Sequence, residues 1–182
     1  MNQPDDHRAA PIRWVVMGVC GCGKSEIGRR LAASLHAPFL EGDAFHSAAN
    51  VAKMAAGTPL DDADRADWLA RLQAEIAAAH ERGAGLVLSC SALKRRYRDL
   101  LRQADPALRF AHLHGDRALI EQRMRARTAH YMPTSLLDSQ LRDLEPLAPD
   151  EAGVRLDIAA APDAIIDQIL QAQGQQSPFI PT

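Results

Sequence analysis

Residues 18–25 read G-V-C-G-C-G-K-S, which is the complete pattern G-x-x-x-x-G-K-[ST] of a phosphate-binding loop. An apolar run, W-V-V-M at residues 14–17, comes directly before it and predicts a buried strand. A strand that enters a glycine-rich turn and continues into a helix places backbone N–H groups and the positive end of the helix dipole at one spot. This stretch therefore predicts an α/β fold that binds a nucleoside triphosphate.

The residues of this loop have separate expected roles. The ammonium of Lys24 can reach the β- and γ-phosphates, and the hydroxyl of Ser25 can bind Mg²⁺. The other positions contribute backbone N–H groups, so we expect small side chains of almost any kind to serve there, cysteine included. The predicted phosphate-binding residues are Gly18, Val19, Cys20, Gly21, Cys22, Gly23, Lys24 and Ser25.

Length, charge and composition limit the remaining possibilities. With 182 residues and 47% hydrophobic content, we expect one domain, with its core at about 12–170 and flexible tails at 1–10 and 171–182. The formal charge of -2 and the few aromatic residues do not suggest nucleic-acid binding. We find neither a signal sequence nor an apolar run long enough to span a membrane, and we expect a cytoplasmic protein.

Strand and helix patterns alternate along the chain. Short apolar runs predict strands at residues 12–17, 39–40, 86–89, 110–113 and 154–158. Apolar residues at helical spacing predict helices that include residues 27–35, 68–76, 94–103, 118–124 and 165–170. Parallel strands need crossover connections, which are right-handed and place helices on both faces of the sheet. We therefore predict a three-layer α/β/α fold around a mainly parallel sheet of about five strands, with a helical lid.

In such a fold the residues that follow each strand form the candidate site, because ligands bind beyond the carboxyl ends of the strands. The second strand leads into E-G-D-A-F-H at residues 41–46, which brings Asp43 and His46 near the phosphates. The Asp43 carboxylate can take a proton from an acceptor hydroxyl or hold the hydration shell of Mg²⁺. Gly-Asp is also an ordinary turn pair, and His46 fits a structural role as well as a functional one.

The third strand is followed by a basic segment, S-C-S-A-L-K-R-R-Y-R at residues 89–98. Ser91 is a candidate cap for the next helix, and Lys94, Arg95 and Arg98 add positive charge to its first turns. Cations oppose the helix dipole at that end. The pattern suggests an anionic ligand nearby, although a solvated basic face explains it equally well.

A second basic segment follows the fourth strand. It contains Arg123 and Arg127 and continues into T-A-H-Y-M-P at residues 128–133. Arginines beside a loop that ends in proline fit a lid, here placed at about 123–140, that closes over the transferring phosphoryl group and excludes water. We assign Arg117 and Arg125 to the exposed surface of the preceding helix.

Two other classes of phosphate-loop protein lack their diagnostic residues. A GTP-binding switch needs N-K-x-D after a later strand, and the nearest string, N-V-A-K at residues 50–53, has neither that order nor that place. A motor or transporter ATPase would end its third strand in Asp or Asp-Glu, whereas this strand ends in S-C-S at residues 89–91. A small-molecule kinase requires neither of these diagnostic segments, so this class remains compatible with the sequence.

The sequence resembles the gluconate kinases, a family within the shikimate- and nucleoside-monophosphate-kinase-like group. The resemblance covers about residues 12–170, and H-x-x-x-N-x-x-K-M and C-S-A-L-K are strings that we do not expect in shikimate or adenylate kinases. The blocks that carry it are M-G-V-C-G-C-G-K-S (17–25), F-L-E-G-D-A-F-H (39–46), N-V-A-K-M-A-A-G-T-P-L (50–60), D-A-D-R-A-D-W-L (62–69), C-S-A-L-K-R-R-Y-R-D-L-L-R (90–102) and R-M-R-A-R-T-A-H-Y-M (123–132).

This resemblance implies phosphorylation of D-gluconate at its 6-hydroxyl by ATP with Mg²⁺, and it is compatible with a homodimer. It implies that Lys24 clamps the phosphates, that Ser25 binds the metal and that Asp43 orients the acceptor hydroxyl as the base. Arg123 and Arg127 would be the lid cations that contact the nucleotide. The expected catalytic residues are Lys24, Asp43, Lys94 and Arg127.

Gluconate is a polyol with one carboxylate, so its pocket needs hydrogen-bonding groups and at least one cation. We prefer Lys94 as that cation, and the choice among the candidates stays open at this stage. The expected substrate-binding residues are Asp43, His46, Lys53, Arg65, Lys94, Arg98 and His130.

One departure from the family pattern and two alternative functions remain. Cys20 and Cys22 stand where the family usually has serine, which leaves the backbone of the loop unchanged. The first alternative is a kinase for a different small hydroxy acid or polyol, since a few changes in a pocket redirect specificity. The second is a nucleotide-binding regulatory module without transfer activity.

Overall fold

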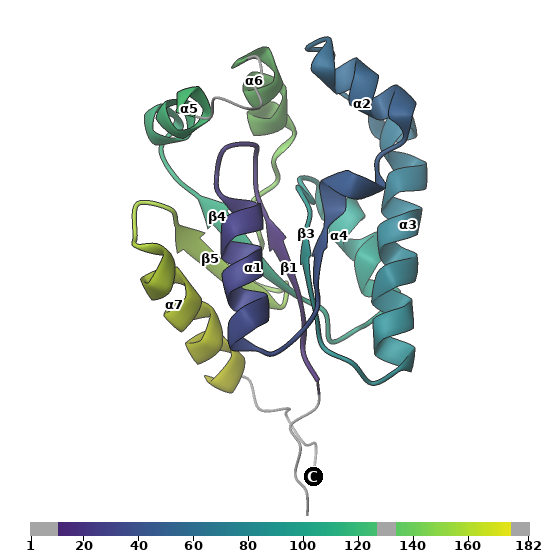
Figure 1. The fold of residues 1–182 in the computed structure, drawn as a ribbon, viewed down its shortest axis with the longest axis vertical. Coiled ribbons are helices and arrows are strands. Elements are labelled where there is room, and N and C mark those ends of the chain that lie inside the picture. Colours follow the sequence, from purple (N-terminus) through teal and green to yellow (C-terminus); the bar gives the residue numbers. More distant parts are fainter. Residues whose placement is uncertain (1–10, 127–133, 176–182) are drawn as a thin grey trace, which may run out of the picture.

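The centre of the protein is a parallel β-sheet with the strand order β2-β3-β1-β4-β5 (Figure 1). The computed structural model describes residues 11–126 and 134–175. All four strand pairings are parallel, so each strand is reached by a crossover connection. The strands are β1 (Arg13–Met17), β2 (Phe39–Glu41), β3 (Leu86–Ser89), β4 (Arg109–His114) and β5 (Gly153–Asp157). The predicted five-stranded parallel sheet is confirmed.

Helices cover both faces of the sheet, as Figure 1 shows for α1 and α7 on one side and for α3 and α4 on the other. Side chains of the central strand β1 alternate between the two layers: Trp14 and Val16 pack in the core under α1 and α7, and Val15 and Met17 pack in the core under α3 and α4. The helices are α1 (Lys24–Ser34), the short 3₁₀ helix η1 (Gly42–Phe45), α2 (Ala48–Ala55), α3 (Asp62–Glu81), α4 (Arg95–Arg102), α5 (Arg117–Arg125), α6 (Thr134–Asp143) and α7 (Pro162–Gln175).

Local sequence explains where the long helix α3 begins. The Asp61 side chain accepts a hydrogen bond from Asp64 N, and the Asp64 side chain accepts one from Asp61 N, at 2.8 and 2.9 Å. This reciprocal capping box satisfies two backbone donors at the helix start, where carboxylates also suit the helix dipole. The apolar stripe that follows, including Trp68, Leu72 and Ile76, is buried against the sheet.

Two helices at the top of the molecule were not predicted as separate elements from the sequence. Of the residues of α2, only Asn50 is buried, so the helix has no core-facing stripe, and its start at the Ser47 cap is set by a hydrogen bond from Asn50 N to Ser47 Oγ. Helix α6 occupies part of the region predicted as a lid. Figure 1 shows α2, α5 and α6 above the carboxyl ends of the strands.

The predicted tails and lid differ in part from the structure. Residues 171–175 are not a tail, because they continue α7, where Gln173 Oε1 accepts a hydrogen bond from Trp14 Nε1 at 3.4 Å. The rest of the predicted tails, at 1–10 and 176–182, lies outside the described residues. Of the predicted lid, residues 123–125 belong to α5 and 134–140 to α6, and Arg127 and His130 lie outside the described residues.

Candidate active site

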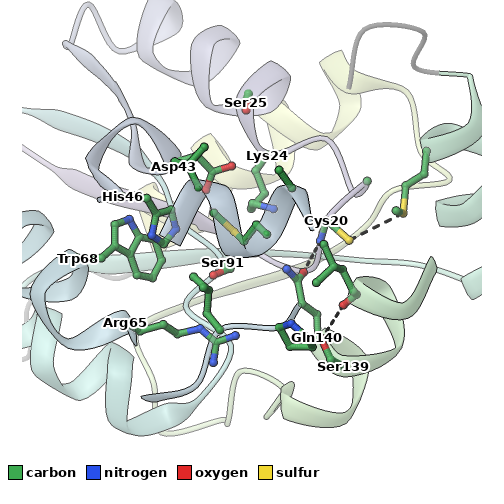
Figure 2. A pocket seen from close by; sticks show the side chains of 18 of the residues that line it. Cys20, Lys24, Ser25, Asp43, His46, Arg65, Trp68, Ser91, Ser139 and Gln140 are labelled. Carbon is green, nitrogen blue, oxygen red and sulfur yellow. Dashed lines mark hydrogen bonds between the residues drawn. The ribbon is translucent and has the colours of Figure 1, made fainter. Parts of the chain in front are cut away.

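A cavity of about 590 Å³ lies at the carboxyl ends of the strands, between the phosphate loop and helices α2, α3 and α6 (Figure 2). Its lining comes from five parts of the chain that are distant in sequence: the loop, the segment from η1 to α3, the segment after β3, α5 and α6. The residues are Cys20, Gly21, Gly23, Lys24 and Ser25 of the loop; Asp43, His46, Val51, Met54, Ala55, Pro59, Leu60, Arg65 and Trp68 of the segment from η1 to α3; and Ser91, Met124, Leu136, Ser139 and Gln140.

The phosphate loop is packed tightly against the sheet. Gly18 has φ +140°, and a Cβ atom there would lie 2.5 Å from Leu113 O, so any other residue would force the loop away from β4. Helix α1 begins at Lys24, immediately after the loop, and its first backbone N–H groups therefore face the cavity. This is the arrangement in which a loop and a helix N-terminus bind an anion together.

The two cysteines of the loop are core residues in this structure. Cys20 and Cys22 are buried within the hydrophobic cluster of the α1 and α7 layer, and Cys20 Sγ lies 3.8 Å from Met124 Sδ. A thiol behaves as a small apolar group in such surroundings. Burial therefore explains how cysteine can replace serine here, since the loop binds its ligand through the backbone.

Lys24, Ser25 and Asp43 line the same cavity, with Asp43 beside Lys24 in Figure 2. Lys24 Nζ donates a hydrogen bond to Val19 O at 3.0 Å. Burial acts to lower the pKa of Lys24, but Cys22 and Asp43 nearby outweigh it and raise that pKa, so the ammonium is charged at neutral pH. A cation and a carboxylate thus share one wall, as phosphoryl transfer to a hydroxyl requires.

Close contact between β2 and β3 places Asp43. A Cβ atom on Gly42 would lie 2.1 Å from Ser89 O, so only glycine permits this approach. Gly42 N donates to Ser89 Oγ at 3.2 Å, and Gly42 O accepts from Trp68 Nε1 at 2.7 Å. The turn that carries Asp43 is therefore held from two elements, and Gly42 has a packing role that the turn interpretation of Gly-Asp did not include.

His46 lies flat on Trp68, with the ring centroids 4.3 Å apart and the planes at 14°. Burial lowers the pKa of His46, and Arg65 lowers it further against the opposite effect of Asp43. The imidazole is therefore neutral at neutral pH. Its Nδ1 atom is buried and has no hydrogen-bond partner within the described residues, and the residue itself lines the cavity.

Arg65 is the candidate carboxylate-binding cation that the structure brings to the cavity. Its Nη1 atom donates to Tyr97 Oη at 3.3 Å and to Asp143 Oδ2 at 3.4 Å, and the guanidinium lies over the Tyr97 ring. Both hydrogen bonds are long, and the fork keeps donors for another partner. Figure 2 shows Arg65 well apart from Asp43 along the cavity.

The other predicted cations lie away from the cavity lining. Lys53 Nζ bonds to Asp64 Oδ2 at 2.5 Å, and Lys94 Nζ bonds to Asp62 Oδ1 at 3.1 Å. Arg98 of α4 is fully buried and forms a bidentate pair with Glu151, so the structure corrects its assignment as a substrate-binding residue. Lys53 and Lys94, the preferred cation, are likewise committed to carboxylates of the protein.

Protein carboxylates also explain the basic start of α4. Arg95 N donates to Glu145 Oε2 at 2.6 Å, and the Arg95 side chain forms two hydrogen bonds with Asp150 at 2.7 and 3.0 Å. The positive charge near the helix dipole is therefore balanced within the chain, and the suggestion of an anionic ligand at this helix is not needed. Ser91 does not cap α4, whose N-cap is Lys94, and instead lines the cavity.

Arg123 connects α5 to the end of β5, since its Nη2 atom donates to Ile158 O at 2.7 Å. The other residue that the sequence assigns to the nucleotide on the lid side, Arg127, lies outside the described residues. Several lining residues were absent from the predicted site. Among them, Ser139 and Gln140 carry no motif signal, and Trp68 was used only as a member of an apolar helical stripe.

The fold and this cavity define a phosphate-loop kinase of a small molecule: a triphosphate cradle and an acceptor pocket share one cavity, and the Asp43 carboxylate lies in it beside Lys24. Residues 14–147 match a family model described as an AAA domain. Among the described residues no helix is long and apolar enough to cross a membrane.

Comparison with known proteins gives the family. The chain is 43% identical to the gluconokinase of Gluconobacter oxydans (strain 621H), over 88% of this chain and 90% of that protein. It is also 43% identical to the thermoresistant gluconokinase of Escherichia coli (strain K12), over 78% and 81%. A crystal structure of a gluconokinase from Sinorhizobium meliloti 1021 superposes with a TM-score of 0.84 at 42% identity, over 92% and 94%. The chain belongs to the gluconokinase family.

Proposed function

We propose that this protein transfers the γ-phosphoryl group of ATP to the 6-hydroxyl of D-gluconate, giving 6-phospho-D-gluconate and ADP. The observation that supports this most strongly is one cavity that contains Lys24 and Ser25 at one end, Asp43 beside them and Arg65 farther along. Such an order suits an acceptor with a hydroxyl at one end and a carboxylate at the other. Family membership supplies the identity of the acceptor.

On the donor side, the backbone N–H groups of the loop and the N-terminus of α1 would bind the phosphates, with Lys24 against the β- and γ-phosphates. The Ser25 hydroxyl and the Asp43 carboxylate are oxygen donors on one cavity, which fits Mg²⁺ because that ion takes one or two protein oxygens and completes its shell with water and phosphate. Bound there, Mg²⁺ would neutralise charge on the phosphate oxygens.

On the acceptor side, we assign Asp43 to the reacting hydroxyl, where its carboxylate holds the proton that leaves as the new P–O bond forms. The neutral His46 imidazole, fixed by Trp68, would hydrogen-bond a further hydroxyl of the substrate. We assign the substrate carboxylate to Arg65 rather than to Lys94, because a planar fork with donors to spare binds a carboxylate with two parallel hydrogen bonds.

We retain the lid region as a proposal. Arg123 bonds Ile158 O at the end of β5, beyond the carboxyl end of a strand, where ligands of such folds bind, and we place it beside the nucleotide base. Arg127 and His130 remain assigned to the nucleotide and the acceptor by family resemblance alone. The single domain, the cytoplasmic location and a homodimer also stay proposals, and light scattering of the purified protein would decide the last of these.

A coupled assay of ADP release tests the proposed function. Gluconate is expected to give the highest kcat/KM in a panel that also contains other sugar acids, glucose and shikimate. Phosphorus NMR of the product should then show a phosphate monoester on the primary 6-hydroxyl. A stronger preference for another acid would replace gluconate as the acceptor, and no ADP release with any acceptor would favour the regulatory module.

A further inference from the structure

Helix α6 contacts both halves of the cavity through two side chains on one face. Gln140 Oε1 accepts a hydrogen bond from Cys20 N of the phosphate loop at 2.6 Å (Figure 2). Asp143, three residues later and therefore on the same face of the helix, accepts a hydrogen bond from Arg65 Nη1 at 3.4 Å. A single helical turn thus connects the donor cradle to the cation on the acceptor side.

Each of these contacts uses a group that the proposed function assigns to a substrate. Cys20 N carries one hydrogen, and a phosphate oxygen that accepts it in good geometry has to replace the Gln140 oxygen. Arg65 has its carboxylate partner in Asp143, and a substrate carboxylate that takes the same side of the fork has to replace it. The Gln140 contact therefore opposes nucleotide binding, and the Asp143 contact opposes a substrate carboxylate that takes the Nη1 side of the Arg65 fork.

The remainder of α6 is held by apolar packing. Leu136 and Leu137 are buried, and Leu137 belongs to the core under α1 and α7. Asp138 forms an ion pair with Arg117 of α5 at 2.7 Å. The helix therefore stays attached when its polar contacts are exchanged, and it can shift as one body rather than unfold.

We propose that α6 is a coupling strap: its Gln140 and Asp143 contacts hold it across the cavity, and each substrate displaces one of them. When the nucleotide displaces Gln140, α6 is held across the cavity by Asp143 alone, which pairs with Arg65 and, at 3.8 Å, with Lys94, and the cost of moving Asp143 away from Arg65 falls. The same holds in the opposite order, because coupling between two sites is reciprocal. ATP and the acceptor consequently bind with positive cooperativity. The Asp143 half rests on the proposed function, whereas the Gln140 half concerns the nucleotide alone.

Titration calorimetry with the magnesium complex of a non-hydrolysable ATP analogue tests the Gln140 contact without any acceptor. Gln140→Leu removes the oxygen that competes for Cys20 N and is expected to tighten binding about three- to tenfold, the range of one net hydrogen bond. Gln140→Glu keeps the competing acceptor and adds a negative charge facing the phosphates, and it is expected to weaken binding. Arg142→Gln changes an exposed residue of the same helix and should leave the affinity unchanged.

Hydrogen exchange gives a readout that needs no ligand. Loss of the Gln140 acceptor should speed amide exchange in the phosphate loop of Gln140→Leu, and Arg142→Gln should exchange like the parent protein. Unchanged or weaker nucleotide binding by Gln140→Leu overturns the competition. Tighter binding by Gln140→Glu overturns it as well.

The coupling itself is measured by repeating the nucleotide titration at saturating gluconate. The parent protein is expected to bind the nucleotide at least about fivefold more tightly than without gluconate, the lower end of usual coupling factors. In Gln140→Leu and in Asp143→Asn this factor should fall towards one. A factor of one in the parent protein overturns the strap. Absence of gluconate binding in the parent protein instead refutes the proposed function, and the titrations without acceptor still decide the Gln140 contact.

Discussion

Arg65 and Arg98 are both buried arginines, with exposed fractions of 6% and 0%, yet their surroundings differ. Arg98 donates to both carboxylate oxygens of Glu151 at 2.7 Å and to the carbonyls of Ala92, Leu93 and Glu145. Arg65 makes two long hydrogen bonds at the wall of a cavity. An arginine whose guanidinium N–H groups are bonded to the protein, like Arg98, stabilises the fold. An arginine that keeps unused N–H groups at a cavity, like Arg65, can bind a ligand.

The hydrogen bonds around Arg98 and Glu151, here called the Arg98 network, position the loop after β3 that carries Ser91. The carbonyl of Ala92 accepts from Arg98 Nη1 at 3.0 Å, and Ala92 itself has φ +42°, a region that costs energy for a residue with a Cβ atom. Glu151 accepts further bonds from Arg102 and from Ala148 N. These bonds hold the pKa of Glu151 at about 2 in spite of burial, which acts to raise it, so the carboxylate stays charged.

The largest expected effect comes from breaking this network. Arg98→Met leaves the Glu151 charge buried with Arg102 as its remaining cation, and the free energy of unfolding should fall by about 3–5 kcal/mol, as for other broken buried ion pairs. Denaturant titration measures the loss. Adding Glu151→Gln removes the buried charge and should recover part of it. A stable Arg98→Met protein with a raised KM for gluconate would place Arg98 in the substrate site after all.

Substitutions at the reacting end of the cavity should reduce activity and leave stability nearly unchanged. Lys24→Ala and Asp43→Ala are each expected to lower kcat at least about 100-fold, because they remove charge stabilisation or the proton acceptor. The thermal midpoint should change little, since neither side chain is part of a buried ion pair like that of Arg98. Steady-state kinetics and thermal melts on the same samples check both statements. Near-normal turnover of Asp43→Ala would remove its assignment as the base.

Protonation of His112 in β4 should destabilise the folded protein in acid. Burial, aided by His114 and Arg155, lowers the pKa of His112 from 6.5 to about 4. Because the folded-state pKa lies below the unfolded value, stability is full above pH 6.5 and is lost as the pH falls towards 4. The loss amounts to about 3 kcal/mol at about 1.4 kcal/mol per unit.

Denaturant titrations between pH 7 and pH 4 measure this loss. His112→Asn is the matched variant, because an amide oxygen can still accept from Leu147 N, as His112 Nδ1 does at 3.4 Å, without taking up a proton. Its stability should depend much less on pH over this range. An equal acid loss in both proteins would assign the effect to other groups.

A smaller effect is expected at Arg65. Arg65→Lys keeps the charge but loses the planar fork, and KM for gluconate should rise about 10- to 100-fold, the worth of a charged hydrogen-bond pair, with kcat nearly unchanged. Lys53→Met is the control, since Lys53 pairs with Asp64 away from the cavity lining and should leave KM unaltered. The reverse result, with Lys53 and not Arg65 controlling KM, would exchange the two assignments.

The sequence predicted the strands well, because the central strands contain short apolar runs buried on both faces, such as W-V-V-M of β1 and L-V-L of β3. The edge strands β2 and β5 are less buried, and their apolar signal is shorter. It predicted the loop, Lys24, Ser25 and Asp43 at the cavity for a related reason: a motif within one turn has its geometry set by local backbone rules. The sequence analysis did not predict α2, an eight-residue helix in which only Asn50 is buried, whereas α6 overlaps the region predicted as a helical lid. The sequence did not predict correctly which cation binds the substrate, because every candidate carries the same charge. Only the partners of each side chain in the folded protein distinguish the candidates.

The amino-acid sequence by itself determined the class of fold, the phosphate loop and the kinase family, since these depend on local patterns and on motifs that lie within short segments. The tertiary structure decided which cation lines the cavity, why Cys20 and Cys22 are tolerated, and which helix connects the two halves of the site. Those outcomes depend on contacts such as Arg65 with Asp143 and Cys20 with Gln140, which are 78 and 120 residues apart in the chain. No local pattern encodes a contact at that separation, because it arises only when the packed sheet brings its strand ends together.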